Sequence, residues 1–240
     1  MLKFAISSKP KDYQELTKML SDYNLVTPHS DPDFMIVTGG DGSILYAERM
    51  YPEIPKITFR KSSVGSMCMY ELKDFQMVMD KVIDGKYEIV EYDKLQMKDF
   101  SSTSKTQIYD DEFVALNEIQ LHNRLPTSAV RFSIYVNDEV LFNSIIGDGV
   151  IISTPFGSGG YYKSVGGLEF KYAIGIALNN PYNFGREHIT IKPDSEIKIK
   201  VLRGSGLMVA DNNPNFIYTG ESNEFIIKRY KNKAKFVKVI

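Results

Sequence analysis

A glycine-rich turn that carries one carboxylate follows a short apolar run early in the sequence. Residues 34–38 read Phe-Met-Ile-Val-Thr, and residues 39–43 read Gly-Gly-Asp-Gly-Ser. Because glycines allow positive φ and close approach of the backbone, the N–H groups of Gly40 and Gly42 could face a phosphate at the start of a helix. This turn is the first candidate for a phosphate-binding site.

The carboxylate of Asp41 does not suit a simple phosphate cradle, because a bound phosphate would repel it. It suits an active site in which it accepts a proton from an attacking hydroxyl, or holds Mg²⁺ through water. The alternative is a tight turn whose aspartate caps the following helix. The turn alone leaves both open.

A second glycine-rich segment, residues 147–161, reads Gly-Asp-Gly-Val-Ile-Ile-Ser-Thr-Pro-Phe-Gly-Ser-Gly-Gly-Tyr. It gathers backbone amides, hydroxyls and an aromatic ring near a predicted buried strand. Amides and hydroxyls suit the phosphates and ribose of a nucleotide, and Tyr161 could stack on a base or contact it through its hydroxyl. Ordinary β-turn glycines are the alternative explanation.

Between these segments, Asn117 and Glu118 lie side by side in an otherwise apolar strand. Successive side chains of a strand point to opposite faces, so at least one of this pair should meet a core or a ligand. Burial without a partner would cost about 1–3 kcal/mol. The alternative is a strand end or bulge at which water surrounds both groups.

Composition limits the classes of function. The chain has 240 residues, with 29 basic and 30 acidic side chains and a formal net charge of −1. This balance gives no overall field that would recruit nucleic acid or an anionic membrane. The sequence shows no signal peptide and no apolar run near the roughly 20 residues of a membrane span, so we expect a cytoplasmic protein.

The cysteine and the histidines indicate no metal centre. Cys68 is the single cysteine, which excludes an intramolecular disulfide, fits a reducing compartment and favours a role as small apolar filler. The histidines at 29, 122 and 188 show no metal-ligand spacing, and we predict no metal site built by the protein alone. His122 lies four residues after Glu118, on the same predicted strand face.

The elements that must position these groups fall into two regions. Up to about residue 95, strands alternate with helices; from there on, short strands dominate. We predict an α+β protein with a Rossmann-like α/β domain of parallel strands over residues 1–95. A β-rich domain, a layered sandwich, should follow over residues 96–240, and its last strand is a candidate for return to the first domain.

Particular elements are expected within this scheme. The predicted strands of the first region are residues 3–7, 34–37 and 56–59, and its helices include residues 12–23 and 44–50. In the second region we expect strands over residues 87–97 and 107–122, among others, and one helical interruption over residues 159–165.

Taken together, the three segments resemble NAD kinases. That family has a GGDGT/S turn, then an Asn-Glu pair on a strand, then a segment of the form DG-hydrophobic-hydrophobic-STPTGSTAY. This sequence has the same features in the same order, in residues 39–43, 117–118 and 148–161. The resemblance covers roughly residues 34 to 212. The GGDGS turn is also found in lipid and sugar kinases, whereas the Asn-Glu pair and the long segment are far more specific.

The resemblance implies roles for individual residues. Asp41 would deprotonate or orient the adenosine 2′-hydroxyl of NAD, and the glycine amides would hold phosphates. Asn117 and Glu118 would contact NAD on its adenosine side or through ribose, and Asp148 would bind the nicotinamide half. Tyr161 would line the adenine pocket. The remaining residues implied to bind the nucleotides are Thr154, Ser158, Gly160 and Asp211, although Asp211 could equally be a turn residue.

Departures from the family pattern affect the nucleotide contacts. Two hydroxyl-bearing positions of STPTGSTAY are Phe156 and Gly159 here, so shape and backbone must hold more of adenine and ribose. In residues 58–67, extra positive charge at Arg60 and Lys61 suggests a hold on the triphosphate tail of the donor. A solvated loop is the alternative there, and Lys163 has the same two interpretations.

The resemblance implies phosphoryl transfer from ATP, or another phosphoryl donor, to the 2′-hydroxyl of NAD, which gives NADP. Mg²⁺ or another divalent metal would accompany ATP, and the protein would form a homodimer or homotetramer. Two alternatives stay open. One is a non-catalytic sensor that binds NAD(P). The other is a lipid or sugar kinase that shares only the GGDGS turn, for which the Asn-Glu pair at residues 117–118 would have no use.

Overall fold

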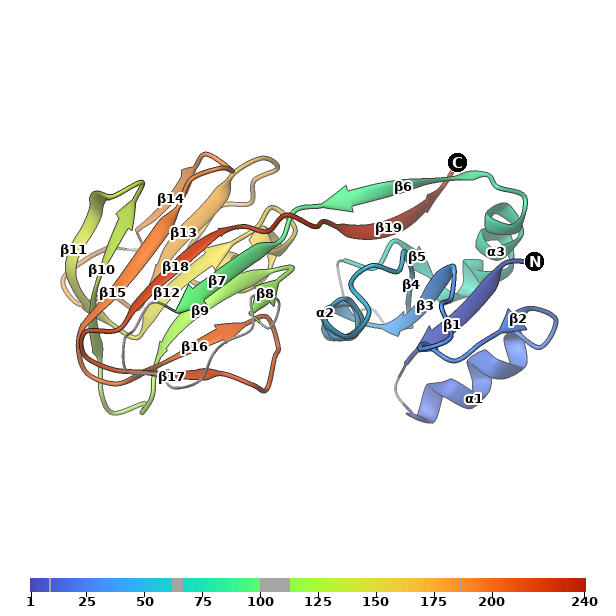
Figure 1. Cartoon of the computed structure of the whole chain (residues 1–240), viewed down its shortest axis with the longest axis horizontal. Helices are drawn as coiled ribbons and strands as arrows, with labels where there is room; N and C mark the ends of the chain where they lie inside the picture. The colour runs from blue at the N-terminus through green and yellow to red at the C-terminus, as the bar shows by residue number, and fades with distance from the viewer. Residues whose placement is uncertain (9, 62–66, 100–112, 186) are drawn as a thin grey trace. The chain divides into compact units, whose positions relative to one another are not determined.

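The chain forms two compact units. The computed structural model describes residues 1–8, 10–61, 67–99, 113–185 and 187–240. The first unit consists of residues 1–92 and 233–240, and the second of residues 93–232 (Figure 1). The chain therefore leaves the first unit once and returns to it for its last strand.

A sheet of seven strands forms the centre of the first unit in the described residues, with the order β2-β1-β3-β4-β19-β6 and β5 paired with β4. Neighbouring strands are parallel except β6, which runs antiparallel to β19. The strands are β1 (Lys3–Ser7), β2 (Asn24–Leu25), β3 (Phe34–Gly39), β4 (Lys56–Arg60), β5 (Tyr70–Glu71), β6 (Tyr87–Tyr92) and β19 (Ala234–Val239).

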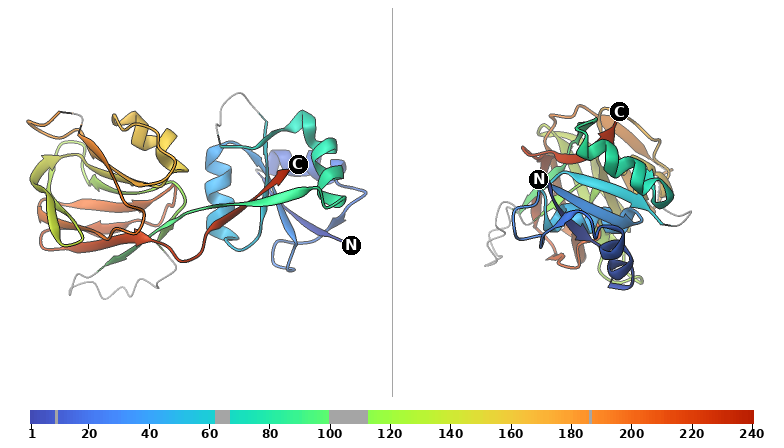
Figure 2. Two further views of the ribbon diagram at one scale, coloured as in Figure 1. Left: turned by 90° about the horizontal axis from the view of Figure 1, so that it is seen from above. Right: turned by 90° about the vertical axis from the view of Figure 1, so that its right-hand side faces the viewer.

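Helices cover both faces of this sheet (Figure 2). Helices α1 (Pro10–Met19) and α3 (Phe75–Ile83), the latter preceded by a 3₁₀ turn over Leu72–Asp74, pack on the face that carries Phe4, Phe34 and Ile57. Helix α2 (Asp41–Met50) lies on the opposite face, because it contacts Lys56, whose side chain points away from that of Ile57.

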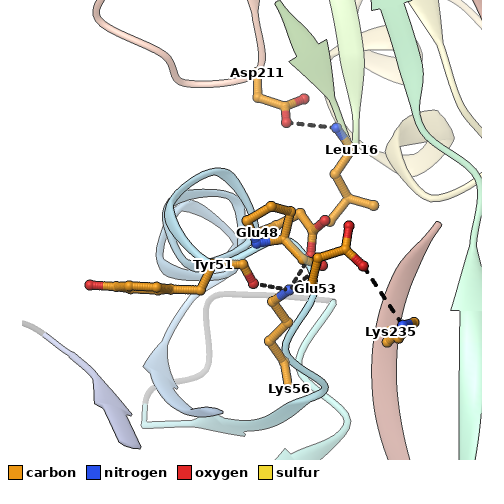
Figure 3. Close-up of polar contacts among 8 residues, drawn as sticks. Glu48, Tyr51, Glu53, Lys56, Leu116, Asp211 and Lys235 are labelled. Carbon is orange, nitrogen blue, oxygen red and sulfur yellow. Dashed lines mark hydrogen bonds and ion pairs between the residues drawn. The ribbon is translucent and has the colours of Figure 1, made fainter. Parts of the chain in front are cut away.

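A buried ion pair joins α2 to β4. The Lys56 ammonium bonds to the carboxylate of Glu48 and donates to the carbonyl oxygen of Tyr51 at 2.8 Å (Figure 3). The Lys56 side chain is 0% exposed and that of Glu48 is 4% exposed. Two buried charges are tolerated at such a site only because each has a partner.

The second unit is a sandwich of two six-stranded sheets in the described residues, with the orders β11-β10-β15-β18-β7-β8 and β14-β13-β12-β9-β16-β17. Its strands are β7 (Leu95–Asp99), β8 (Val114–Ala115), β9 (Glu118–Asn123), β10 (Val130–Val136), β11 (Glu139–Gly147), β12 (Gly149–Ser153), β13 (Ile174–Asn179), β14 (His188–Ile191), β15 (Ile197–Arg203), β16 (Gly206–Ala210), β17 (Ile217–Thr219) and β18 (Glu224–Arg229).

The core of the sandwich comes from alternate residues of facing strands. On β9, Ile119 and Leu121 point inward and pack with Phe132 of β10 and Phe225 of β18. The alternate residues of β9, which are Glu118, Gln120 and His122, therefore point to the outer face of their sheet. A 3₁₀ turn over Gly157–Gly159 and the short helix α4 (Tyr161–Ser164) follow β12.

The predicted fold class, an α/β domain and a β-rich sandwich, is confirmed, and several element boundaries need correction. The expected strand over residues 87–97 is two strands, β6 and β7, which pair in different sheets. The expected helix over residues 12–23 ends at Met19, and helix α2 begins at Asp41 rather than residue 44. Residues 107–112 of another expected strand, over residues 107–122, lie outside the described residues, and its described part is two strands, β8 and β9, in different sheets.

The helical interruption expected over residues 159–165 is the 3₁₀ turn and α4, which are separated at Gly160. None of the helices in the described ranges has the length and apolar character needed to cross a membrane.

Candidate functional site

The glycine-rich turn joins β3 to α2 in the first unit. Gly39 has φ of +135°, and a Cβ there would lie 2.3 Å from the Ser43 hydroxyl, so only glycine fits. Gly40 is the N-cap residue of α2, and no side chain of the described residues caps this helix. Asp41 is thus in the first turn of the helix and is not the cap, whereas Gly42 is exposed at the helix start.

The half-buried carboxylate of Asp41 accepts the backbone N–H of Met67 at 3.0 Å. The thiol of Cys68 lies beside the same turn, 3.7 Å from the carbonyl oxygen of Gly39. Burial, and next the charge of Asp41, raise the pKa of Cys68 to about 11. The thiol therefore stays protonated, which agrees with a packing role and disfavours a nucleophile.

Two cations predicted to hold the triphosphate tail have carboxylate partners within the first unit. Arg60 donates to Glu71 at 3.0 Å, and Lys61 donates to Asp12 at 2.8 Å and to Glu15 at 2.6 Å. Residues 62–66, which belong to the same predicted segment (residues 58–67), lie outside the described residues.

The Asn-Glu pair lies at the start of β9 in the second unit. Asn117 is 6% exposed and Glu118 is 5% exposed, so the solvated alternative is wrong. The side-chain oxygens Asn117 Oδ1 and Glu118 Oε2 are buried and make no hydrogen bond with any described residue. Two buried acceptors without partners are costly, which is typical of a site that a ligand completes.

Glu118 has an unusual protonation equilibrium. Burial is the main cause that raises the pKa of its carboxyl group to about 8, and the negative charge of Asp211 adds to it. A hydrogen bond from Gln120 acts in the opposite direction. The group can therefore carry a proton near neutral pH and can both donate and accept a hydrogen bond.

Asp211 fixes the backbone of this pair and of the residue before it. Its carboxylate accepts the N–H group of Leu116 at 2.7 Å (Figure 3). It also accepts the N–H groups of Asn117 at 2.8 Å and Glu118 at 3.1 Å. The residue has φ of +50°, a conformation that aspartate tolerates in turns. This geometry favours the structural interpretation of Asp211, whose oxygens bind backbone amides.

A row of polar side chains continues from Glu118 along the outer face of the sheet. Gln120 donates to Glu118 Oε1 at 3.0 Å, and the Nε2–H of His122 donates to the amide oxygen of Gln120 at 2.9 Å. The His122 ring is parallel to the ring of Tyr161, with centroids 5.7 Å and planes 7° apart. Asn179 of β13 donates to the Tyr161 hydroxyl at 3.1 Å.

The two hydroxyls predicted to bind the nucleotide donate hydrogen bonds to backbone carbonyl oxygens of the protein itself. Thr154 donates to the carbonyl oxygen of Leu116 at 2.6 Å and is 1% exposed. Ser158 donates to the carbonyl oxygen of Pro155 at 2.8 Å and is 3% exposed. Thr154 therefore ties the loop to the segment just before β9, and Ser158 stabilises the loop itself. A direct contact of either hydroxyl with a ligand stays a prediction.

The other predicted binding residues of the second unit lie in the turn before β12 and in the segment after it. Asp148, in the turn before β12, accepts the Asn180 amide at 3.0 Å and the Asn123 amide at 3.3 Å. Gly160 separates the 3₁₀ turn from α4. Lys163 is exposed and donates to Glu169 at 2.5 Å.

Close backbone approach explains one of the loop glycines. A Cβ at Gly157 would lie 2.4 Å from the carbonyl oxygen of Asn117, so a larger residue would push the loop away from the Asn-Glu pair. The glycine-rich segment is thus seated against the start of β9.

The predicted residues divide between the two units. Asp41, Gly40, Gly42 and Arg60 belong to the first unit, and the others belong to the second. Within the second unit the structure gathers the Asn-Glu pair, Asp211 and the glycine-rich loop. The sequence prediction missed Gln120 and Asn179, although alternation along residues 118–122 would have placed Gln120 on the same face. The described residues contain no cluster of three or more histidine, cysteine or acidic side chains that could hold a metal ion.

A glycine turn between a parallel strand and a helix is typical of nucleotide-binding proteins. Comparison with known families makes this specific. The family model of the ATP-NAD kinase C-terminal domain matches residues 116–239. The chain belongs to the NAD kinase family, as the three sequence segments predicted.

Curated relatives agree with the family. A bifunctional NADP phosphatase/NAD kinase of Methanococcus maripaludis is 31% identical over 209 residues, which is 85% of this chain and 36% of the relative. The chain thus spans about a third of that protein. An NAD kinase of Clostridium botulinum is 30% identical over 213 residues, which is 86% of this chain and 73% of the relative.

Solved structures show the same fold. Yeast NADH kinase complexed with NADH has a TM-score of 0.87 and 18% identity, over 100% of this chain and 84% of that one. An NAD kinase from Archaeoglobus fulgidus in complex with ATP has a TM-score of 0.81 and 20% identity, over 99% of this chain and 94% of that one.

Proposed function

We propose that the chain is an NAD kinase, which transfers a phosphoryl group from ATP, or another phosphoryl donor, to the adenosine 2′-hydroxyl of NAD. The observation that carries this proposal is the pair of buried acceptors without partners, Asn117 Oδ1 and Glu118 Oε2, in a member of this family. Ribose hydroxyls are donors that would satisfy both oxygens.

Asp41 is the proposed base. A carboxylate that takes the proton of the 2′-hydroxyl increases the nucleophilicity of that oxygen, and phosphoryl transfer needs positioning and charge neutralisation more than covalent help. The N–H groups of the turn at residues 39–43 would face donor phosphates at the start of α2. Asp148 and Tyr161 would bind the NAD side, as the resemblance implies.

Divalent metal enters with the donor. Mg²⁺ is usually held by one or two carboxylates together with substrate phosphates, and Asp41 could supply the carboxylate. When bound, the ion neutralises charge on the transferring phosphoryl group. Arg60 and Lys163 would add positive charge near phosphates if their partners Glu71 and Glu169 release them.

We further propose a cytoplasmic homodimer or homotetramer, by analogy with the family. The alternative of a lipid or sugar kinase is less favoured, because the family match includes the Asn-Glu pair in its residues 116–239. The alternative of a non-catalytic NAD(P) sensor is less favoured because the curated relatives are named as NAD kinases.

The decisive experiment measures NADP formation with a panel of phosphoryl donors. Wild-type protein should produce NADP, and Asp41→Asn should fold normally yet lose turnover by orders of magnitude. Near-normal turnover in Asp41→Asn would contradict the role of the base. Binding of NAD without any NADP formation, with ATP and Mg²⁺ present, would instead support the sensor.

A further inference from the structure

Two side chains outside the predicted site connect its carboxyl group to its aromatic ring. Gln120 and His122 lie on β9, and their hydrogen bonds of 3.0 Å and 2.9 Å link Glu118 to the imidazole that stacks on Tyr161. Asn179 continues the series through the Tyr161 hydroxyl. The series thus runs from β9 through the start of α4 to β13.

We propose that Gln120 and His122 are positioning residues, which hold the Glu118 carboxyl group and the Tyr161 ring in one fixed arrangement and thereby set the affinity for the dinucleotide. This inference rests on the proposed function. It assigns neither residue to the chemical step.

The geometry gives Gln120 control over the orientation of the carboxyl group. Its amide holds Glu118 Oε1, whereas Oε2 of the same group is buried with no hydrogen-bond partner among the described residues. Rotation about the carboxyl torsion would exchange these two oxygens. A bond to Oε1 therefore fixes which oxygen, Oε2, is left for a hydrogen bond with a ligand.

His122 has two separable contacts. Its Nε2–H fixes which way the Gln120 amide points, because an amide oxygen accepts and an amide nitrogen donates. Its ring plane supports the ring of Tyr161. Burial lowers the pKa of His122, which favours the neutral ring at pH 7, and the nearby charge of Asp148 partly opposes this. A neutral ring adds no charge to the row.

Substitutions can separate these contacts. Gln120→Met keeps the length of the side chain and removes both hydrogen bonds. His122→Phe keeps a flat ring against Tyr161 and removes the N–H, whereas His122→Leu removes both. Ser133→Ala is the matched control, because it also removes a side-chain hydrogen bond of a buried residue. Ser133 is 1% exposed, and its hydroxyl donates to Asn143 at 3.1 Å. Both residues belong to the sheet that does not contain β9.

The experiment measures the Kd for NAD by calorimetry and the KM and kcat for NADP formation. Gln120→Met and His122→Phe should each raise Kd and KM about tenfold, the equivalent of about one net hydrogen bond, with kcat within about twofold. His122→Leu should bind more weakly than His122→Phe, because it also loses the support of Tyr161. Ser133→Ala should behave as wild type.

The double variant Gln120→Met/His122→Phe provides the strictest test. If the two residues act in series, the first substitution already disconnects the second from Glu118, so the double variant should bind NAD no more weakly than either single variant. Additive losses would overturn the proposal, as would single variants with the same Kd as Ser133→Ala. Should Gln120→Met fail to fold, as thermal unfolding would show, the comparison of His122→Phe with His122→Leu decides.

The failure of this inference differs from that of the proposed function. If wild-type protein neither binds NAD nor forms NADP, the kinase proposal fails and this inference fails with it. If wild-type protein does both and the substitutions change nothing, only the positioning role fails.

Discussion

Replacement of Asp211 by asparagine tests how the start of β9 is held. The carboxylate accepts three backbone N–H groups from residues 116–118, and the Leu116 bond of 2.7 Å is the shortest. Asparagine has nearly the same shape and tolerates φ of +50°, so the substitution changes hydrogen bonding and charge but not the turn. One oxygen becomes an NH₂ group that cannot accept a hydrogen bond.

The magnitude follows from these bonds. Suppose that the remaining side-chain oxygen keeps its hydrogen bonds to the N–H groups of Asn117 and Glu118. The N–H of Leu116 then faces the new NH₂ group, which is also a donor, and its charge-assisted bond is lost. The free energy of unfolding should fall by about 2–3 kcal/mol. The pKa of Glu118 should fall as well, because the charge of Asp211 helps to raise it to about 8. It should stay above its usual range, since burial is the larger cause.

Urea denaturation measures the stability, and NMR titration of labelled glutamate carboxyls measures the pKa. Asp138→Asn is the control in the same unit, because Asp138 is 84% exposed and bonds to Lys198 at 2.8 Å, so its loss should cost less than about 1 kcal/mol. Equal losses for the two variants would refute the account of Asp211 as the anchor of this segment. So would an unchanged or raised pKa of Glu118.

Three further predictions concern other groups. The pKa of Glu118 is raised from 4.5 to about 8 in the folded protein, so its contribution to stability is full below pH 4.5 and should decline by about 1.4 kcal/mol per pH unit toward pH 8. Urea denaturation at a series of pH values measures this decline in the free energy of unfolding, and the decline should be absent in Glu118→Gln. Lys56→Met should lower the free energy of unfolding by about 3–5 kcal/mol because it leaves Glu48 charged and buried, and Lys56→Met/Glu48→Leu should recover much of the loss. Gly157→Ala should raise the KM for NAD and lower the melting temperature, because its methyl group would lie 2.4 Å from a carbonyl oxygen, whereas Gly159→Ala, with its nearest contact at 3.6 Å, should do neither.

Local sequence signals predicted the elements that one segment of chain determines by itself. The apolar run and glycines of residues 34–43 gave β3 and its turn, and the helix starts earlier than expected because an acidic residue in the first turn is favourable there. The break between β6 and β7 could not be predicted from residues 87–97, because both halves favour strands. Only pairing with β19 and β18, far along the chain, separates them.

The same limit applies to the candidate site. Alternation along β9 correctly placed Glu118 and His122 on one face, because that depends on backbone geometry alone. The hydroxyls of Thr154 and Ser158 fitted a nucleotide by type, but their bonds to Leu116 and Pro155 depend on how the loop folds over the strand. Residue type and spacing do not report which partner a hydroxyl meets.

The return of the chain to the first unit has a consequence for biosynthesis. Strand β19 lies between β4 and β6, and Tyr70 holds it from the side by accepting the N–H of Val239 at 2.7 Å. A ribosome makes residues 1–92 first, yet β4 lacks this neighbour until residues 234–239 have been translated. The edge of β4 therefore stays unpaired with β19 while the ribosome synthesises the whole sandwich. A fragment that stops before residue 233 would keep this edge exposed and prone to aggregation.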